Sequence, residues 1–363
     1  MNNNLLSSIR ALTQLNGPPG QEEEIRDYII KNVKEYADII EVDHMGNLIV
    51  GKGLTADYKI AIVSHMDEVS LIVKNIENNG VIRFEKSGMI DDRVLPGREV
   101  NIISLNGLKK GVIGTKSRHL LSEEEMQKNL SYKQMWIDVG ASSRKAIEEM
   151  GITVGCGICF ATGFCELADG SLLSKALDDR IGCAVMSETF RLVAERGTRG
   201  IDTYLIGTVQ EEIGARGAAI AAFDLKPDLA IVLDTVPVED PVVSSEQQTV
   251  KINQGPVIRI FDIHSSLKGA ISNPVIVKRL IEVAEKKEIP YQKDVLSGTF
   301  LDSTTLQMTG GGIPVGSICF PRKYSHSPTE IASINDAEDT VKLLVAFIES
   351  LAEERLIFGE KIK

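Results

Sequence analysis

Four short apolar runs, each leading to a residue type that can bind a metal, constrain the fold of this chain most strongly. The runs cover residues 59–64, 204–210, 229–233 and 314–320. Their β-branched content and the turn residues around them predict buried strands. The residues that follow them are His65, Glu211, Glu212, Asp234 and, after a short loop, His326. Because ligands bind at the carboxyl ends of the strands in an open α/β sheet, the sequence predicts a two-metal hydrolytic site on one rim of a sheet.

The length and composition exclude several classes of protein. At 363 residues the chain is long enough for two domains and a large buried core. A net charge of −11 argues against binding to nucleic acid or to an anionic membrane. No stretch approaches the roughly 18 apolar residues of a membrane span, and the N-terminus lacks the pattern of a signal peptide. Five scattered cysteines fit a reducing compartment, so we expect a cytoplasmic protein with no nucleic-acid or membrane partner.

Helical and strand patterns alternate in the first and last parts of the chain. We expect two helices within 5–36 and further helices at 180–195, 214–223, 273–288 and 336–355. The expected strands are 39–50, 59–64, 202–210, 229–234, 257–261 and 314–319. This alternation predicts an α/β fold in which a mostly parallel sheet is sandwiched by helices.

The segment from about 70 to 165 has a different pattern. Short alternating strands with frequent Gly and Asn dominate it, and only 122–130 and 142–149 have helical periodicity. This pattern is typical of a small β-barrel or sandwich. We therefore expect a discontinuous α/β domain formed by 1–69 and 166–363, interrupted by an inserted β-barrel domain at 70–165.

Pairs of acidic residues supply further candidates, and each has an ordinary structural interpretation as well. Asp178 and Asp179 stand directly before an apolar helix, where they could cap the helix or bridge two cations. The 91–93 segment of the insertion has the same Asp-Asp-Arg sequence but no helix after it, so we expect a loop there. Two residues after His65, Asp67 lies on the same side of an extended chain and could accept the second imidazole N–H.

Glu211 and Glu212 are adjacent at the end of an expected strand. Successive strand side chains point to opposite faces, so one carboxylate could bind a metal while the other faces the reacting water. An exposed strand end is the ordinary alternative for this pair, as a turn is for Asp234 and a polar loop is for His326. Only the whole set, in which every run leads to such a residue, supports the hypothesis of a site.

The ordered set of these residues resembles the tetrahedral metallo-aminopeptidases, the family of glutamyl, leucyl and lysyl aminopeptidases, some of whose members are labelled endoglucanases. The matches are His65-x-Asp67, Asp178-Asp179-Arg180-x-Gly182, Glu211-Glu212, Asp234, His326, Gly17-Pro18-Pro19-Gly20-x-Glu22, Leu95-Pro96-Gly97, 111–116 and 210–217. They span nearly the whole chain. The chain departs from the family at 298–303, where Gly-Thr-Asp-Ala is common, and at Lys323, where Arg is common.

The resemblance implies a zinc-peptidase-like fold and a role for each matched residue. Two divalent ions per subunit are implied, with zinc and cobalt foremost and manganese as an alternative. The insertion would be a dimerisation domain, and the dimers would build a homo-oligomer, a tetrahedral dodecamer. The implied roles are His65 and Asp234 on one metal, Glu212 and His326 on the other, Asp178 as the bridge with Asp179 beside it, Glu211 as general base, and Asp67 orienting His65.

The resulting hypothesis is a metal-dependent aminopeptidase that hydrolyses the N-terminal residue of short peptides through a water held by two metals. A glycoside hydrolase of the endoglucanase type is one alternative, although its two carboxylates must face each other across a sugar and cannot be adjacent residues. A non-catalytic scaffold held together by metal is another. The sequence does not indicate which N-terminal residue is removed.

Overall fold

The computed structural model describes residues 2–197, 200–238, 249–264 and 269–359. Two sets of elements form its larger part, a sheet and the helices that pack on it. The strands of the sheet are β1 (Ile39–Val42), β2 (Leu48–Lys52), β3 (Lys59–His65), β12 (Asp202–Thr208), β13 (Leu229–Pro237), β14 (Val257–Ile263), β15 (Gly269–Ile271), β16 (Gln292–Ser297) and β17 (Val315–Arg322). The helices are α1 (Asn2–Gln14), α2 (Glu23–Val33), α5 (Leu177–Arg196), α6 (Ala218–Leu225), α7 (Pro274–Lys286), α8 (Ser303–Leu306) and α9 (Ile334–Glu353).

The sheet is parallel at its centre, and antiparallel pairs flank that centre on both sides. Its strand order is β1-β2-β12-β3-β13-β17-β14-β15, and β16 pairs with β14. Strands β12, β3, β13 and β17 are parallel neighbours, so their carboxyl ends meet on one rim. The predicted α/β fold with a mostly parallel sheet is therefore confirmed. A smaller sheet is formed by β10 (Cys165–Glu166), β11 (Ser171–Ser174) and β18 (Glu330–Ser333).

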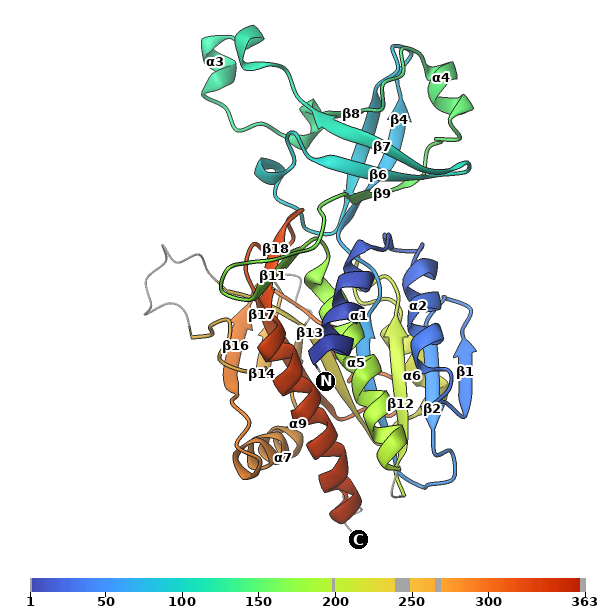
Figure 1. Cartoon of the computed structure of the whole chain (residues 1–363), viewed down its shortest axis with the longest axis vertical. Coiled ribbons are helices and arrows are strands. Elements are labelled where there is room, and N and C mark those ends of the chain that lie inside the picture. The colour runs from blue at the N-terminus through green and yellow to red at the C-terminus, as the bar shows by residue number, and fades with distance from the viewer. Residues whose placement is uncertain (1, 198–199, 239–248, 265–268, 360–363) are drawn as a thin grey trace.

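The two faces of the large sheet contribute to two different apolar cores. Along β3, Ile60 and Ile62 belong to one core while Ala61 and Val63 belong to the other, as the two-residue period of a strand requires. Helices α1, α2, α5, α7 and α9 supply side chains to the first core, and α6 and α8 to the second. Figure 1 shows α1, α5 and α9 in front of the sheet. Burial on both faces explains why these strands are continuous apolar runs.

A separate closed barrel stands at one end of the α/β part (Figure 1). Its strands in barrel order are β4 (Ser70–Ile76), β5 (Ile82–Ser87), β8 (Trp136–Asp138), β7 (Gly107–Gly114), β6 (Glu99–Ser104) and β9 (Gly157–Phe160). Leu71, Ile102 and Ile158 lie in its interior, which forms an apolar cluster of its own. All six strands fall within the expected insertion, while the exact boundaries 70–165 and the dimerisation role stay predictions.

Several elements differ from the prediction. Residues 39–50 form two strands, because the Asp43 carboxylate accepts the N–H groups of Met45 and Asn47 and closes a turn between them. The helix expected at 214–223 begins at Ala218, since Ala215 before it has a left-handed φ of 51°. The helices expected at 122–130 and 142–149 are the shorter α3 (Glu123–Met126) and α4 (Arg144–Glu149). Strands β15, β16 and β18 and helix α8 were not predicted. In the described part of the chain, no helix has the length and apolar content to cross a membrane.

Candidate metal centre

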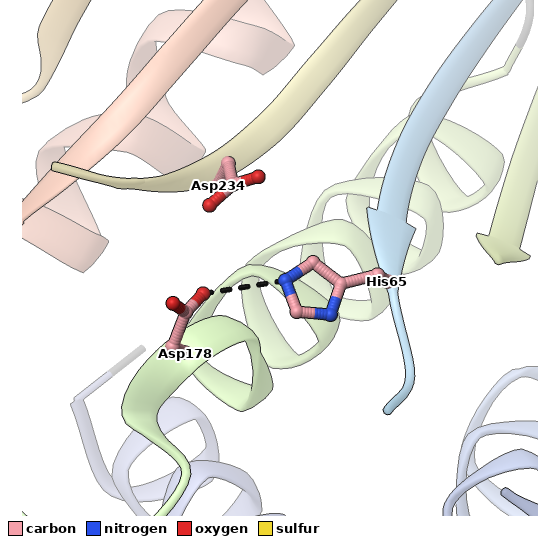
Figure 2. Close-up of side chains that lie close together, drawn as sticks. All are labelled: His65, Asp178 and Asp234. Carbon is pink, nitrogen blue, oxygen red and sulfur yellow. Dashed lines mark hydrogen bonds and ion pairs between the residues drawn. The ribbon is translucent and has the colours of Figure 1, made fainter. Parts of the chain in front are cut away.

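Three of the predicted ligands converge above the carboxyl ends of the parallel strands. His65 is the last residue of β3, Asp178 lies in the first turn of α5 and Asp234 lies in β13. Figure 2 shows the three side chains turned toward a common space. The Nε2 atom of His65 is 3.2 Å from Oδ1 of Asp178. One ligand atom of each residue lies within 4.8 Å of the others, so this triad could hold a metal ion.

A second triad shares Asp178 with the first. Nε2 of His326 is 3.4 Å from Oδ2 of Asp178 and 3.6 Å from Oε2 of Glu212. These three ligand atoms also lie within 4.8 Å of one another. Asp178 therefore turns one oxygen to His65 and the other to His326. The grouping corresponds to the one that the resemblance implies, and the roles of these residues as ligands remain a proposal.

The local settings of two candidates differ from the prediction. Strand β13 continues to Pro237, so Asp234 lies inside the strand and not at its end. Strand β12 already ends at Thr208, and the backbone turns at Gln210, which has a φ of 59°. The expectation that strand alternation separates Glu211 from Glu212 is therefore wrong, because both carboxylates belong to a turn.

Asp67 binds the backbone of this turn. Its Oδ1 accepts the N–H of Glu211 at 3.0 Å, and its Oδ2 accepts the N–H of Glu212 at 3.1 Å. Nδ1 of His65 lies 3.5 Å from Oδ1 of Asp67, which is longer than an ordinary N–H···O hydrogen bond. Asp67 thus faces His65 as expected, but its short contacts are to the two amides, which the sequence did not indicate.

The carboxylates of the centre are buried against one another, and their ionisation is correspondingly unfavourable. Burial raises the pKa of Glu212 to about 7 and that of Asp179 to about 7. Burial also raises the pKa values of Glu211 and Asp234 well above the ordinary range. Asp178 is the exception, because Arg322 and the two imidazoles outweigh its burial and hold its pKa well below the usual value.

The neighbouring acids raise the pKa values of the two imidazoles, whereas burial lowers them. Burial alone would lower the pKa of His65, but the contact with Asp178 and the nearby carboxylate of Asp67 raise it well above the usual value. For His326, the charge of Glu212 and the contact with Asp178 outweigh burial and raise the pKa to about 9. The centre is therefore a buried group of anions that favours cations, whether protons or metal ions.

The donor set and its unpaired oxygens fit divalent cations. Oε1 of Glu211 and Oε1 of Glu212 are buried and have no hydrogen-bond partner among the described residues. A buried carboxylate oxygen without a partner is costly, and a bound cation would supply that partner. Imidazole and carboxylate together suit zinc, cobalt or manganese. The residues present thus fit a two-metal site without selecting the metal.

The comparison with known proteins agrees with this geometry. The family model of the M42 glutamyl aminopeptidases matches residues 46–343. The chain belongs to this family. It is 32% identical to the lysyl aminopeptidase of Pyrococcus furiosus over 90% of this chain and 91% of that protein. Membership makes the chain a hydrolase of the aminopeptidase class and does not favour the glycoside hydrolase alternative.

Solved structures share the fold over nearly the whole M42 chain. Aminopeptidase APDkam598 from the archaeon Desulfurococcus kamchatkensis matches with a TM-score of 0.90 and 35% identity, covering 96% of this chain and 95% of that one. The TET1 peptidase of Pyrococcus horikoshii matches with a TM-score of 0.85 and 33% identity, covering 95% and 99%. That peptidase can assemble into a tetrahedron or a large octahedral shell.

In this M42 chain, Arg322 is a functional candidate that the sequence analysis missed. It lies buried at the end of β17, and its Nη2 donates to Oδ2 of Asp178 at 2.7 Å. Its Nη1 donates to Glu330, whose other oxygen accepts the backbone N–H of Asp178 at 3.1 Å. The available signal was a charged residue at the end of an apolar strand, immediately before Lys323. Lys323 itself is not among the described residues that line the site.

A cavity of about 240 Å³ opens beside the centre. Its apolar lining includes Met89, Pro237, Phe300 and Leu301. Met89 comes from the barrel, and its backbone carbonyl accepts the Nδ1–H of His326 at 3.1 Å. Because that contact leaves Nε2 of His326 free to face the centre, a residue of the barrel fixes the orientation of a candidate ligand.

Proposed function

We propose that this chain is a metal-dependent aminopeptidase that uses two divalent cations to remove the N-terminal residue of short peptides. The observation that carries the proposal is the shared Asp178, which completes two triads, one with each of its carboxylate oxygens. A single structural metal would need only one such triad. Family membership supports the reaction class, and the fit of the donor set supports the metals.

The proposed roles follow from the contacts of each residue. His65 and Asp234 would hold one cation, Glu212 and His326 the other, with Asp178 shared between them. Bound there, such cations lower the pKa of a water and polarise the scissile carbonyl.

Glu211 is the proposed general base, which takes a proton from the water and returns it to the leaving amine. Its unpaired Oε1 suits a group that must accept and release a proton. Asp67 positions this base through the Glu211 amide.

Glu211→Gln tests the proposed base. The variant keeps the shape of the side chain but cannot accept the proton, so the turnover of leucyl-p-nitroanilide should fall by about 10²–10⁴-fold. Metal content, measured by mass spectrometry of the native protein, should stay at the wild-type value. Glu123→Gln on the exposed surface of the barrel is the matched control and should keep full turnover. Near-normal turnover by Glu211→Gln with its metal still bound would exclude the general-base role.

Metal removal separates the proposal from a metal-stabilised scaffold. Chelation should abolish peptide cleavage, and addition of zinc, cobalt or manganese should restore it to different extents. An oligomer that persists with each metal but never cleaves a peptide would instead support the scaffold. Cleavage of a cellulosic polymer that survives chelation would support a glycoside hydrolase.

The cavity supports a preference for apolar N-terminal residues. Met89, Phe300 and Leu301 line it, while Arg322 is the one Lys or Arg among its described lining residues. Arg322 is already paired with Asp178 and Glu330, so it offers no free charge to an acidic substrate side chain. We expect leucyl- and phenylalanyl-p-nitroanilide to exceed the glutamyl and lysyl substrates in kcat/KM by at least about tenfold. The reverse order would refute this preference while leaving the reaction class intact.

We further propose that residues 70–165 are a dimerisation domain and that dimers assemble into a tetrahedral dodecamer. The shells formed by the TET1 relative support the assembly. Leu105 and Leu120 support the interface, because both lie in this segment with exposed apolar side chains, at 81% and 70% of full exposure. Native mass spectrometry should find twelve subunits, and a monomer at micromolar concentration would contradict this assembly. The five free cysteines fit the proposed cytoplasmic location.

A further inference from the structure

Glu22 occupies the N-cap position of α2, but its carboxylate does not cap that helix. An Asp, Asn, Ser or Thr at this position ordinarily accepts an N–H from the first turn, which stabilises a helix by about 1 kcal/mol. Here Oε1 of Glu22 accepts the N–H of Gly20 at 2.6 Å and the N–H of Gln210 at 3.2 Å. The residue is only 3% exposed, so these backbone contacts compensate a buried carboxylate. The side chain is therefore directed away from its own helix and toward the turn at 210–212.

The backbone N–H groups of that turn need hydrogen-bond acceptors that the sheet does not provide. Strand β12 ends at Thr208, and Gln210 adopts a left-handed backbone conformation, which costs about 1–2 kcal/mol for a residue other than glycine. The next two amides, of Glu211 and Glu212, donate to Asp67. The Glu22 carboxylate accepts the N–H of Gln210, so two buried carboxylates, Glu22 and Asp67, bind three successive backbone N–H groups.

Other contacts make this arrangement rigid from the N-terminal side. Gln21 donates its N–H to the Pro18 carbonyl at 2.9 Å, which closes a turn directly before Glu22. The Gly17 carbonyl accepts the N–H of Glu68, and the Gly17 N–H donates to the Glu68 side chain. The 17–22 segment is thus fixed to the strand end that carries Asp67. Glu22 and Asp67 approach the turn from two segments that are themselves joined.

We propose that Glu22 is a positioning residue, which fixes the left-handed Gln210 and thereby the directions in which Glu211 and Glu212 point. The catalytic part of the proposal rests on the proposed function, because that function assigns the roles of Glu211 and Glu212. The structural part rests on the contacts alone. Glu22 touches neither candidate metal triad, so it acts through the backbone of the turn.

Two variants of Glu22 separate the accepting oxygen from the charge. Glu22→Gln keeps an oxygen that can accept both N–H groups, whereas Glu22→Ala removes it. We expect Glu22→Ala to lower kcat for leucyl-p-nitroanilide by about 10–100-fold with little change in KM. Glu22→Gln should restore kcat to within about threefold of the wild type, since the positioning depends on the acceptor. Glu23→Ala, on the exposed side of the same helix turn, is the control and should keep wild-type kcat.

Hydrogen exchange provides a readout that does not depend on activity. In Glu22→Ala, peptides covering 209–213 should exchange faster than in the wild type, while peptides from β3 and the barrel should not change. Glu22→Gln should exchange as the wild type does. Wild-type exchange at 209–213 in Glu22→Ala would overturn the proposal, and so would a uniform increase over the whole chain, which indicates general destabilisation.

The remaining outcomes are also informative. If the wild type cleaves no peptide with any metal, the proposed function fails, but the exchange comparison still decides whether Glu22 fixes the turn. If Glu22→Ala does not fold, Glu22→Asp carries the test, because it keeps the charge but is one methylene too short to reach Gln210. Glu22→Asp should then lose kcat and protection at 209–213 together. Retention of both by Glu22→Asp would overturn the proposal.

Discussion

Two segments of this chain share the sequence Asp-Asp-Arg and have opposite surroundings. In the barrel, Arg93 pairs with its own neighbour Asp91, and the two side chains are 79% and 44% exposed. At the start of α5, Arg180 is fully buried and pairs with Glu68, a residue 112 positions away. The guanidinium that contacts Asp178 comes from Arg322, 144 positions away.

This difference shows what three residues can and cannot determine. At 91–93 the local sequence supplies the partners of Arg93, because the Asp91 side chain accepts the Arg93 N–H and also binds its guanidinium. Such an exposed pair contributes little to stability. At 178–180 the same residues depend on distant segments, since an unpaired buried charge is strongly destabilising. The role of the tripeptide is therefore set by its distant partners and not by its three residues alone.

The largest expected effect comes from removing the anionic partner of each arginine. Glu68 neutralises both Lys175 and Arg180 in a buried cluster, with contacts of 2.8 and 3.2 Å. Glu68→Gln leaves two buried cations without a carboxylate and should lower the free energy of unfolding by roughly 3–5 kcal/mol. Asp91→Asn makes the equivalent change in the barrel and should alter it by less than about 0.5 kcal/mol. Urea unfolding of both variants measures the contrast, and equal costs would mean that burial does not distinguish the two segments.

The second-largest expected effect is on activity and comes from Asp178, the first acid of the pair at the start of α5. Asp178→Asn removes a charge from the residue shared by both triads, so kcat/KM should fall by about 10²–10³-fold or more. Titration with cobalt should show weaker binding at both positions, because each triad contains Asp178. Asp91→Asn should keep wild-type kcat/KM and cobalt binding. Full activity of Asp178→Asn would remove the shared carboxylate from the mechanism.

The same contrast explains how far the sequence could predict the site. His65, Asp234 and Glu212 were placed together because parallel strands bring their carboxyl ends to one rim, and that geometry follows from the order of apolar runs. Their pairing with Asp178 came from a resemblance to a family and not from spacing. The 91–93 segment was predicted as a loop because no apolar helix follows it, but in the structure Asp92–Val94 form a short 3₁₀ helix.

Contacts that depend on packing could not be predicted. Arg322 reaches Asp178 only after β17 and α5 have packed, and the Met89 carbonyl reaches His326 only after the barrel has docked on the α/β part. The turn at Gln210 was missed because a left-handed residue other than glycine leaves no mark in an apolar pattern. Backbone carbonyls and amides carry no residue signature, so the partners of Glu22 and Asp67 appear only in the structure.

The smallest effect concerns the pH dependence of the metal-free protein. The pKa values of Glu212 and Asp179 are raised to about 7, from about 4 in an unfolded chain, because burial disfavours their ionised forms. A raised pKa means that the folded state binds more protons, so this stability is present below about pH 4 and is lost as the pH rises through 7. The pKa of His326 is raised to about 9 by Glu212 and Asp178, so its contribution to stability is also lost as the pH rises, but over a higher pH range. The contribution of Asp91 to stability has the opposite sign, because Arg93 lowers the pKa of Asp91 to about 2. That contribution does not change above about pH 5.

Chelated protein should therefore become less stable from pH 5 to pH 9, by at least about 1–2 kcal/mol. Bound cations favour the ionised carboxylates, so the gain in Tm on adding zinc should increase over the same range. Differential scanning fluorimetry at pH 5, 7 and 9, with chelator or with zinc, measures both trends. Asp91→Asn should reproduce the wild-type profile, because the barrel pair does not titrate in this window. A chelated protein whose Tm rises toward pH 9 would show that burial does not disfavour the ionised forms of Glu212 and Asp179 as this geometry requires.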